Sequence, residues 1–230
     1  MSHAVVAIPV SHLTKGKVPT AAVIVGSISP DFPYLLVLTP THAPGHSILG
    51  VLVHCLFPAL AALFIWYRWL EKPTLAFWKL PERSRSAETP SIPLIIVGVL
   101  IGALSHVLWD STSHSYSAIV ESSPFWNFKL LSLPIYKWNQ YLSGVFGLVI
   151  LGLWYLNALM KNIKTPYAGN FYGGVVIYAI SITAIVLIGN IIHQSNSIGD
   201  IAVRTSIGVM SGGVIAAIVY GALNQSRHNA

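Results

Sequence analysis

Charged side chains are scarce in this sequence. Only 9% of its 230 residues are Asp, Glu, Lys or Arg, whereas a typical soluble domain carries charge on about a quarter of its residues. Cysteine is scarcer still: Cys55 stands alone, so no disulfide forms within the chain. Apolar residues make up 54% of the sequence, and the mean hydropathy is +0.66. These proportions exclude an ordinary soluble domain and are typical of a protein embedded in lipid.

The formal net charge of +6 does not indicate a nucleic-acid partner. Most Lys and Arg residues lie between apolar runs, where such residues set the orientation of membrane helices. No soluble basic face is present to bind a phosphate backbone. We therefore expect the lipid bilayer to be the main partner of the chain and expect no nucleic acid.

Long apolar runs dominate the chain from residue 48 onward. A helix needs roughly 20 predominantly apolar residues to cross a hydrocarbon core, and five runs approach or exceed that length. The sequence predicts an all-α fold with a single membrane domain over residues 1–230, in which residues 48–230 form a bundle of about five transmembrane helices. The five runs are Ile48–Leu70, Ile92–Trp109, Tyr141–Met160, Phe171–His193 and Ile201–Leu223.

The distribution of basic residues predicts the orientation of these helices. Lys and Arg gather in the segments 71–91 and 161–170, which the positive-inside rule places in the cytoplasm. The segment before Ile48, the segment 110–140 and the segment 194–200 then lie outside. We also expect the N-terminus to be retained, because no basic region precedes its first apolar stretch.

The N-terminal part, residues 1–47, is expected to form a helical hairpin. Ala4–Val10 and Val18–Ser29 are apolar but too short to span a bilayer, and Lys15–Lys17 separates them. A re-entrant or interfacial hairpin would bring His3 and Asp31 close together. Irregular backbone at membrane depth is tolerated only when protein buries it or when it lines a wet cavity, so we expect Asp31 to line a cavity.

Histidines accompany two of the three aspartates. His106, Asp110 and His114 are spaced i, i+4 and i+8, which places them on one face of a helix. Zinc, manganese and iron all accept imidazole and carboxylate ligands. Because an ionisable group within a membrane helix is by default a functional candidate, the pattern indicates a metal site.

A second set of candidates lies on the same predicted outer side of the membrane. It comprises Asp31, His46 and, if the hairpin forms, His3. Together the two sets supply six candidate metal ligands from three distant stretches. That number is enough for one complete metal site or for two adjacent ones.

Plainer interpretations stay open for several residues. The histidines and aspartate could form a hydrogen-bonded cluster at a helix end without metal. His54 is expected in the core or in a hydrogen bond between helices, and His42 is either a loop residue or a spare ligand. Glu121 is either a solvated loop residue or an acid/base. Asp200 and Arg204 stand one helical turn apart and are expected to form an ion pair.

Four short stretches of the sequence form a recognisable set: Ser2–Val10, Val25–Pro33, Gly45–Ser47 and Ser105–His114. The most specific of their features is the Gly-Ser-x-x-Pro-Asp element that ends at Asp31. Together the stretches resemble a family of bacterial membrane proteins grouped with membrane-bound metal-dependent hydrolases, and more remotely zinc-dependent phospholipase C. The resemblance covers about the first half of the chain, and residues 140–230 match only as generic membrane helices.

The resemblance implies a metal centre with a defined division of roles. The histidine and aspartate four residues apart would bind metal, and Asp31 would both ligate the metal and activate a water. The chain lacks an obvious later His-x₃-Glu pair, so one or two divalent ions, zinc first, are implied rather than three. The implied ligands are His3, Asp31, His46, His106, Asp110 and, as a further ligand, His114.

The sequence thus predicts a membrane-embedded hydrolase that acts through a metal-activated water on a phosphoester of a lipid or lipid-linked substrate. We expect it in a bacterial cytoplasmic membrane, with the metal site on the outer side. One alternative is a zinc-dependent lipid amidase of the ceramidase type. The other is a transporter or scaffold whose metal site is structural.

Overall fold

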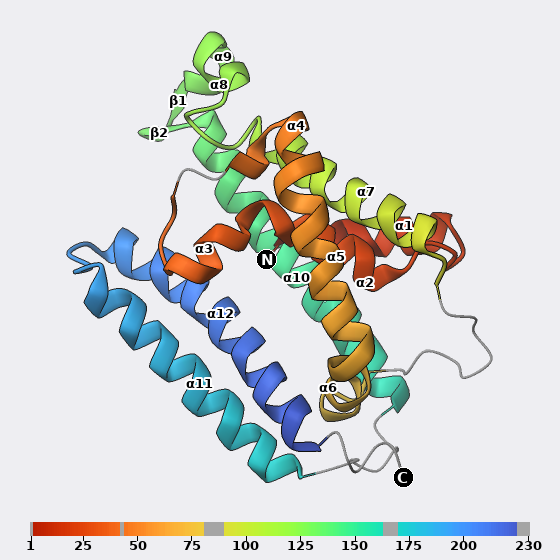
Figure 1. Cartoon of the computed structure of the whole chain (residues 1–230). Coiled ribbons are helices and arrows are strands. Elements are labelled where there is room, and N and C mark those ends of the chain that lie inside the picture. The colour runs from red at the N-terminus through yellow and green to blue at the C-terminus, as the bar shows by residue number, and fades with distance from the viewer. Residues whose placement is uncertain (1, 42–43, 81–89, 163–169, 225–230) are drawn as a thin grey trace. The chain divides into compact units, whose positions relative to one another are not determined.

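The computed structural model describes residues 2–41, 44–80, 90–162 and 170–224, and its long elements there are all α-helical (Figure 1). The described strands, β1 (Lys129–Leu130) and β2 (Leu133–Pro134), have two residues each and pair as an antiparallel hairpin. Six described helices are long and apolar enough to cross a membrane, which confirms the predicted all-α, polytopic architecture. They are Thr20–Val37, Ile48–Phe77, Ile92–Asp110, Ile135–Lys161, Phe171–Ile192 and Ile198–Asn224.

The first of these helices adds a span to the five expected from the sequence. Helix α2 (Thr20–Ile28) alone is too short, but the 3-10 turn η2 (Ser29–Asp31) continues it into α3 (Phe32–Val37), giving 18 residues. The irregular backbone expected around Asp31 is therefore helical. Proline is tolerated there because Pro33 lies in the first turn of α3, where its missing N–H would have no helical acceptor.

The chain divides into two compact units. The second unit comprises Asp31–Ala43, Phe64–Glu88 and Tyr155–Ala230, and the first comprises Met1–Pro30, Pro44–Leu63 and Thr89–Trp154. Besides α2, the first unit contains η1 (Ser2–Val6), α1 (Ala7–Leu13), η3 (Pro44–His46), α4 (Ile48–Gly50), the π-helical η4 (Val51–Cys55), α7 (Ile92–Asp110), α8 (Ala118–Ser122), α9 (Pro124–Asn127), the β-hairpin and most of α10 (Ile135–Asn162).

Glycines hold α2 and α7 of the first unit in close contact (Figure 1). A Cβ atom on Gly102 would meet the carbonyl oxygen of Val23 and would lie 2.6 Å from the backbone nitrogen of Ser27. A Cβ atom on Gly26 would likewise lie 2.7 Å from the Cα atom of Val99. Small residues allow such backbone contact between membrane helices. The contact brings the end of α2 against the middle of α7, one turn before His106.

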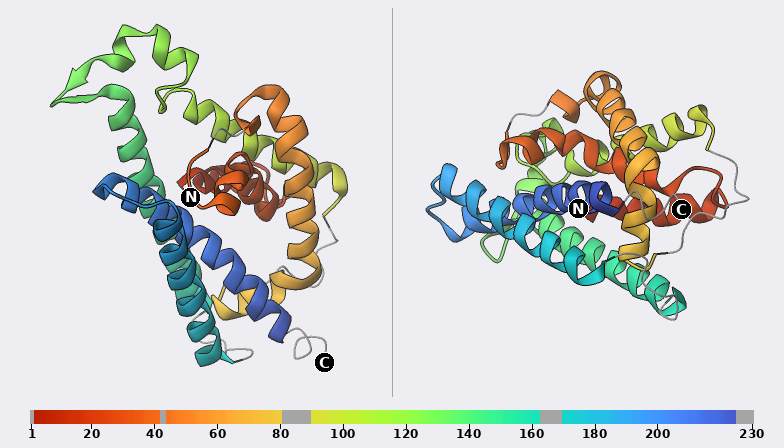
Figure 2. Two further views of the ribbon diagram at one scale, coloured as in Figure 1. Left: turned by 60° about the vertical axis from the view of Figure 1, so that its left-hand side comes forward. Right: turned by 60° about the horizontal axis from the view of Figure 1, so that its bottom comes forward.

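The second unit is built on two long helices, α11 (Phe171–Ile192) and α12 (Ile198–Asn224), which lie side by side and antiparallel (Figure 2). Gly208 faces Val186 and Gly212 faces Ile182, so small residues again set the approach of the helices. The unit also contains α3, α6 (Glu71–Phe77), the end of α5 (Leu56–Ile65) and the π-helical η5 (Trp66–Leu70).

The prediction of an ion pair between Asp200 and Arg204 is wrong. Asp200 Oδ2 instead accepts a hydrogen bond from Ser197 Oγ at 2.8 Å, and Ser197 Oγ in turn accepts one from the backbone N–H of Asp200. Arg204 Nη1 donates to Ser195 Oγ at 2.8 Å, and its Nε donates to Thr39 Oγ1 at 3.4 Å. A local capping arrangement at the start of α12 thus holds the carboxylate.

The contact between α2 and α7 should depend on the absence of a side chain at residue 102. The substitution Gly102→Ala should destabilise the protein by about 1–3 kcal/mol, because the new methyl group meets backbone atoms that have no freedom to move. Thermal unfolding in detergent measures the effect as a lower melting temperature. Gly144→Ala in α10 is the matched control, because a Cβ there meets no atom within 4 Å. Equal melting temperatures for the two variants would contradict this account of the packing.

Candidate metal centre

Four imidazole nitrogens surround the carboxylate of Asp110, the last residue of α7. Oδ2 lies 3.2 Å from His106 Nε2 and 3.4 Å from His46 Nε2. Oδ1 lies 3.5 Å from His3 Nε2 and 3.6 Å from His114 Nδ1. All five residues belong to the first unit. The structure therefore brings together five of the six residues predicted as ligands.

His106 is oriented by the backbone of α2. Its Nδ1 lies 2.7 Å from the carbonyl oxygen of Ser27, which accepts a hydrogen bond and so requires a proton on Nδ1. In the neutral ring, Nε2 then carries a lone pair directed at Asp110 Oδ2. Two acceptor atoms 3.2 Å apart repel each other unless a cation, either a proton or a metal ion, lies between them. A carbonyl that fixes the tautomer of a histidine in this way is typical of the second shell of metal sites.

The position of His46 depends on close packing of the preceding residue. A Cβ atom on Gly45 would lie 2.9 Å from Cys55 Sγ and 3.1 Å from the Cα atom of Pro30. The thiol of Cys55, fully buried in η4, lies 3.7 Å from the carbonyl oxygen of Gly45 and donates to it. Ser47 then caps α4, since its Oγ accepts a hydrogen bond from the N–H of Gly50 at 3.0 Å. The turn η3 is thereby held so that His46 reaches Asp110.

The geometry fits a divalent cation. Ligand atoms about 2.0–2.2 Å from a tetrahedral zinc ion are about 3.3–3.6 Å apart, close to the four nitrogen–oxygen distances around Asp110. The potential ligand atoms of His3, His106 and Asp110 all lie within 4.8 Å of one another. Asp110 Oδ1 is buried and accepts no hydrogen bond from the described residues, although a buried carboxylate oxygen normally has a partner. A metal ion would satisfy it.

Stacking of two imidazole rings supports the same conclusion. The rings of His3 and His106 lie face to face, with centroids 4.0 Å apart and planes inclined by 25°. Two imidazolium cations at this distance would repel each other in a buried site. Neutral rings that share one cation with Asp110 avoid that repulsion.

His114 reaches Asp110 from a turn and not from the helix, because α7 ends at Asp110. Lys137 Nζ donates to Gln140 Oε1 at 3.0 Å, so the amide nitrogen of Gln140 faces His114 Nε2, also at 3.0 Å. His114 Nε2 is then an acceptor, and the proton lies on Nδ1, which faces Ser113 Oγ and Asp110. In this arrangement His114 donates to its neighbours, and its role as a metal ligand stays a prediction.

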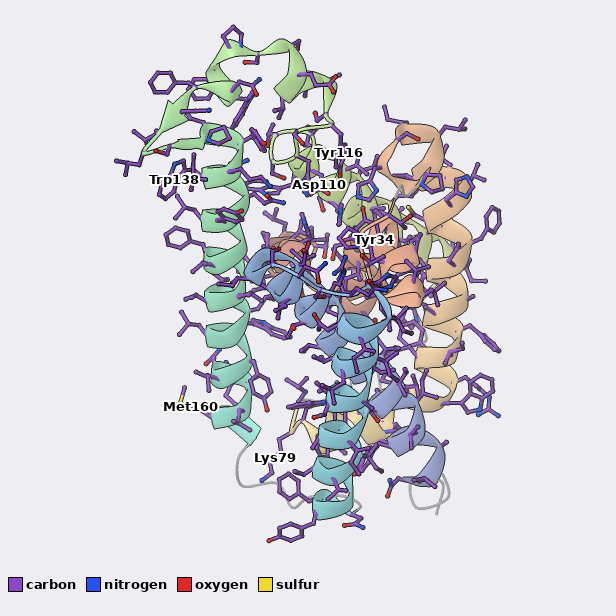
Figure 3. All side chains as sticks on the ribbon, turned by 90° about the vertical axis from the view of Figure 1, so that its left-hand side faces the viewer. Tyr34, Lys79, Asp110, Tyr116, Trp138 and Met160 are labelled. Atoms are coloured by element: carbon purple, nitrogen blue, oxygen red, sulfur yellow. The ribbon has the colours of Figure 1, made fainter. Side chains whose placement is uncertain are left out.

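A cavity of about 310 Å³ opens onto the cluster. His46 and Asp110 line it together with the hydroxyl-bearing Ser111, Tyr116 and Ser117. Figure 3 shows Tyr116 near Asp110, which ends α7. The rest of the wall is apolar and consists of Val107, Ala118 and Ile119. The site therefore has a polar base and an apolar side.

Tyr116 was not predicted from the sequence as a site residue. The centroid of its ring lies 5.2 Å from that of His114 and 6.5 Å from that of His46. The one feature of the sequence that could have indicated Tyr116 is its position two residues after His114. No sequence feature indicates that Gln140 and Lys137 belong to the site, because they lie on α10, more than 20 residues after His114.

The other residues considered from the sequence are Asp31, His42, His54 and Glu121. Asp31 follows Pro30 in the chain, begins the second unit and is half-buried; its role as a ligand stays a prediction. His54 is exposed on η4, so it is not part of the core. Glu121 is exposed on α8, and His42 lies outside the described residues.

These features define a polytopic helical membrane protein with a buried cluster of histidines around one aspartate. The chain belongs to the family described as a domain of unknown function, DUF4184, whose profile matches residues 1–223. The match covers the C-terminal helices as well as the first half of the chain. No curated protein and no solved structure matches the sequence. The family description names no activity, so the likeness to metal-dependent hydrolases and phospholipase C stays a prediction.

The contact with Gln140 should fix the tautomer of His114. In metal-free protein carrying ¹⁵N-labelled histidine, we expect His114 to be protonated on Nδ1, and Gln140→Leu should give a mixture of tautomers because it removes a hydrogen bond worth about 1 kcal/mol. Nitrogen chemical shifts report the tautomer, and His114→Asn identifies the signal. Lys129→Gln, on the β-hairpin, is the control. A proton on Nε2 in the unsubstituted protein would contradict the arrangement.

Proposed function

We propose that this protein is a membrane-embedded, metal-dependent hydrolase that cleaves a phosphoester of a lipid or lipid-linked substrate, with zinc as its metal. The observation that carries the proposal is a buried carboxylate ringed by imidazole nitrogens at the base of a cavity. A structural metal site is closed, whereas a catalytic one keeps a position open to water and substrate. The cavity beside Asp110 supplies such an opening.

The ligand set that we propose is His3, His46, His106 and Asp110. Each histidine presents Nε2 to the carboxylate, at 3.5, 3.4 and 3.2 Å respectively. Imidazole and carboxylate ligands suit zinc, and three histidines with one carboxylate satisfy its usual four-coordinate geometry. These four residues would hold the ion beside the cavity, where it would supply Lewis acidity.

The protein would contribute orientation and charge to the reaction. A divalent ion in this ligand set supplies Lewis acidity and activates a water near neutral pH. The Ser27 carbonyl holds the ring of His106, and Nδ1 of His114 lies 3.6 Å from Asp110 Oδ1. In the hydrolysis, the water oxygen bonds to phosphorus while the bond from phosphorus to the leaving oxygen breaks, and the leaving oxygen takes up a proton. We propose Asp31 as the group that orients the water, as the sequence resemblance implies.

The cavity favours a lipid-linked substrate. Its polar base fits a phosphate group, and the wall formed by Val107, Ala118 and Ile119 fits the adjoining apolar chain. Ile119 is 46% exposed, so this wall continues to the surface of the protein. We propose, from the loop charges, that the protein resides in a bacterial cytoplasmic membrane and that the site opens on the outer side.

Removal of two ligands should abolish metal binding. Purified protein should carry near-stoichiometric zinc by elemental analysis, and the double substitution His106→Ala/Asp110→Ala should lower the zinc content at least tenfold, since outer-shell changes alone cost metal sites about 10–100-fold in affinity. His54→Ala, which removes an exposed histidine, is the control and should retain zinc. Unsubstituted protein that binds no metal after reconstitution with zinc, manganese or iron would overturn the proposal.

The protein should hydrolyse phosphoester lipids, and this activity should depend on Asp31. Zinc-loaded protein should hydrolyse phospholipid phosphoesters, and Asp31→Asn should lower kcat by about 10²–10⁴-fold, the usual contribution of a general base, while it retains most of the zinc. Glu121→Gln, an exposed carboxylate, is the control and should retain full activity. Hydrolysis of amide lipids instead of phosphoesters would support the ceramidase-type alternative. No turnover of either class by a zinc-loaded protein would support a structural metal site.

A further inference from the structure

A second and larger cavity, of about 590 Å³, lies in the first unit away from the metal centre. The two cavities share no lining residue. Thr20, at the start of α2, lines the second cavity, whereas Ser27, near the end of α2, binds His106. Seven residues of helix separate them, which corresponds to about 10 Å. Polar and aromatic residues on its wall are Ser11, His12, Lys15, Thr20 and Trp154.

A well-formed turn places Lys15 at this cavity. Lys15 and Gly16 have positive φ angles of 52° and 75°, a combination that ends α1. The backbone N–H of Lys15 donates to the carbonyl oxygen of His12 at 3.1 Å, and that of Gly16 donates to the carbonyl oxygen of Ser11 at 2.9 Å. The turn is thus fixed by its own hydrogen bonds, and the side chain of Lys15 remains for another partner.

The described residues of the first unit hold no acidic partner for Lys15. Their only carboxylates are those of Asp110, which lies in the metal centre, and of Glu121, which lies on α8. The wall of the cavity therefore carries an uncompensated positive charge. Ser11 and Thr20 add hydroxyl groups, which suit the oxygens of a phosphate.

The other walls match a lipid better than a free anion. Ala7 and Ile8 line one side, and the half-exposed ring of Trp154 lies at the edge. Tryptophan prefers the boundary between the headgroups and the acyl chains of a bilayer. Thr20 is also the first residue of the candidate span Thr20–Val37, so this cavity lies at one end of a membrane crossing.

We infer that this cavity binds the phosphate headgroup of an anionic phospholipid, with Lys15 as the cationic contact and Ala7, Ile8 and Trp154 against the acyl chains. The sequence alone placed the whole segment before Ile48 outside, but the added span Thr20–Val37 puts its start, next to Lys15, on the opposite side from the start of the span at Ile48. We therefore assign this end of the hairpin to the cytoplasmic leaflet, where anionic lipids attract basic residues near the membrane. The two cavities share no lining residue, so this lipid site is distinct from the site proposed at the metal centre.

The test compares Lys15→Gln with Lys17→Gln. Both remove one exposed positive charge, but only Lys15 lines the cavity. Binding of phosphatidylglycerol and phosphatidylcholine to detergent-purified protein is measured by native mass spectrometry. We expect the unsubstituted protein to prefer phosphatidylglycerol, Lys15→Gln to weaken that binding about fivefold, and Lys17→Gln to change it less than about twofold. Ser11→Phe, which fills the cavity, should remove the preference.

Several outcomes would overturn the inference. Equal weakening by the two lysine substitutions would mean that only general surface charge attracts the lipid. Equal binding of phosphatidylglycerol and phosphatidylcholine would exclude an anionic headgroup site. Inorganic phosphate that displaces phosphatidylglycerol at equal concentration would identify free phosphate as the ligand. The zinc content of Lys15→Gln should equal that of the unsubstituted protein, so failure here is distinguishable from failure of the proposed metal centre.

Discussion

A carboxylate buried within an apolar helical protein requires a compensating positive charge. Burial of an isolated ion costs several kcal/mol, and the cost is offset only by close, well-oriented partners. Four histidines surround Asp110, contributed by η1, η3, the end of α7 and the turn that follows it. The Ser27 carbonyl takes the Nδ1 proton of His106, so a neutral His106 offers only a lone pair. The divalent ion that we propose would resolve this conflict between acceptors.

Helix packing and chemistry are linked through the same few residues. Gly26 and Gly102 bring the backbones of α2 and α7 together, and this contact sets the position of the Ser27 carbonyl. Gly45, pressed between Pro30 and Cys55, performs a similar role for His46. Small residues at these points allow separate segments to deliver imidazole nitrogens within a few tenths of an ångström of a metal ligand shell. Side chains at these glycines would separate the segments and disperse the site.

Sequence patterns predicted most of the architecture and singled out five residues that the structure brings together. Apolar runs of about 20 residues can only be membrane helices, and rare ionisable groups in such helices are confined to a few functional positions. The pattern could not reveal Gln140 and Lys137, because they meet His114 through tertiary structure, nor Tyr116, because aromatic residues are common near membrane interfaces. Two expectations were wrong because of local interactions. Asp200 accepts a hydrogen bond from Ser197 instead of pairing with Arg204, and the backbone expected to be irregular around Asp31 is helical, with Pro30 and Pro33 included in it.

The central claim is that His3, His46, His106 and Asp110 share one divalent ion. X-ray absorption at the zinc edge, measured on zinc-reconstituted protein in detergent, tests it most directly. The account predicts a first shell made only of nitrogen and oxygen at about 2.0–2.2 Å, with the outer-shell scattering of imidazole rings. A sulfur scatterer at about 2.3 Å, which would implicate Cys55, or a shell without imidazole would contradict it.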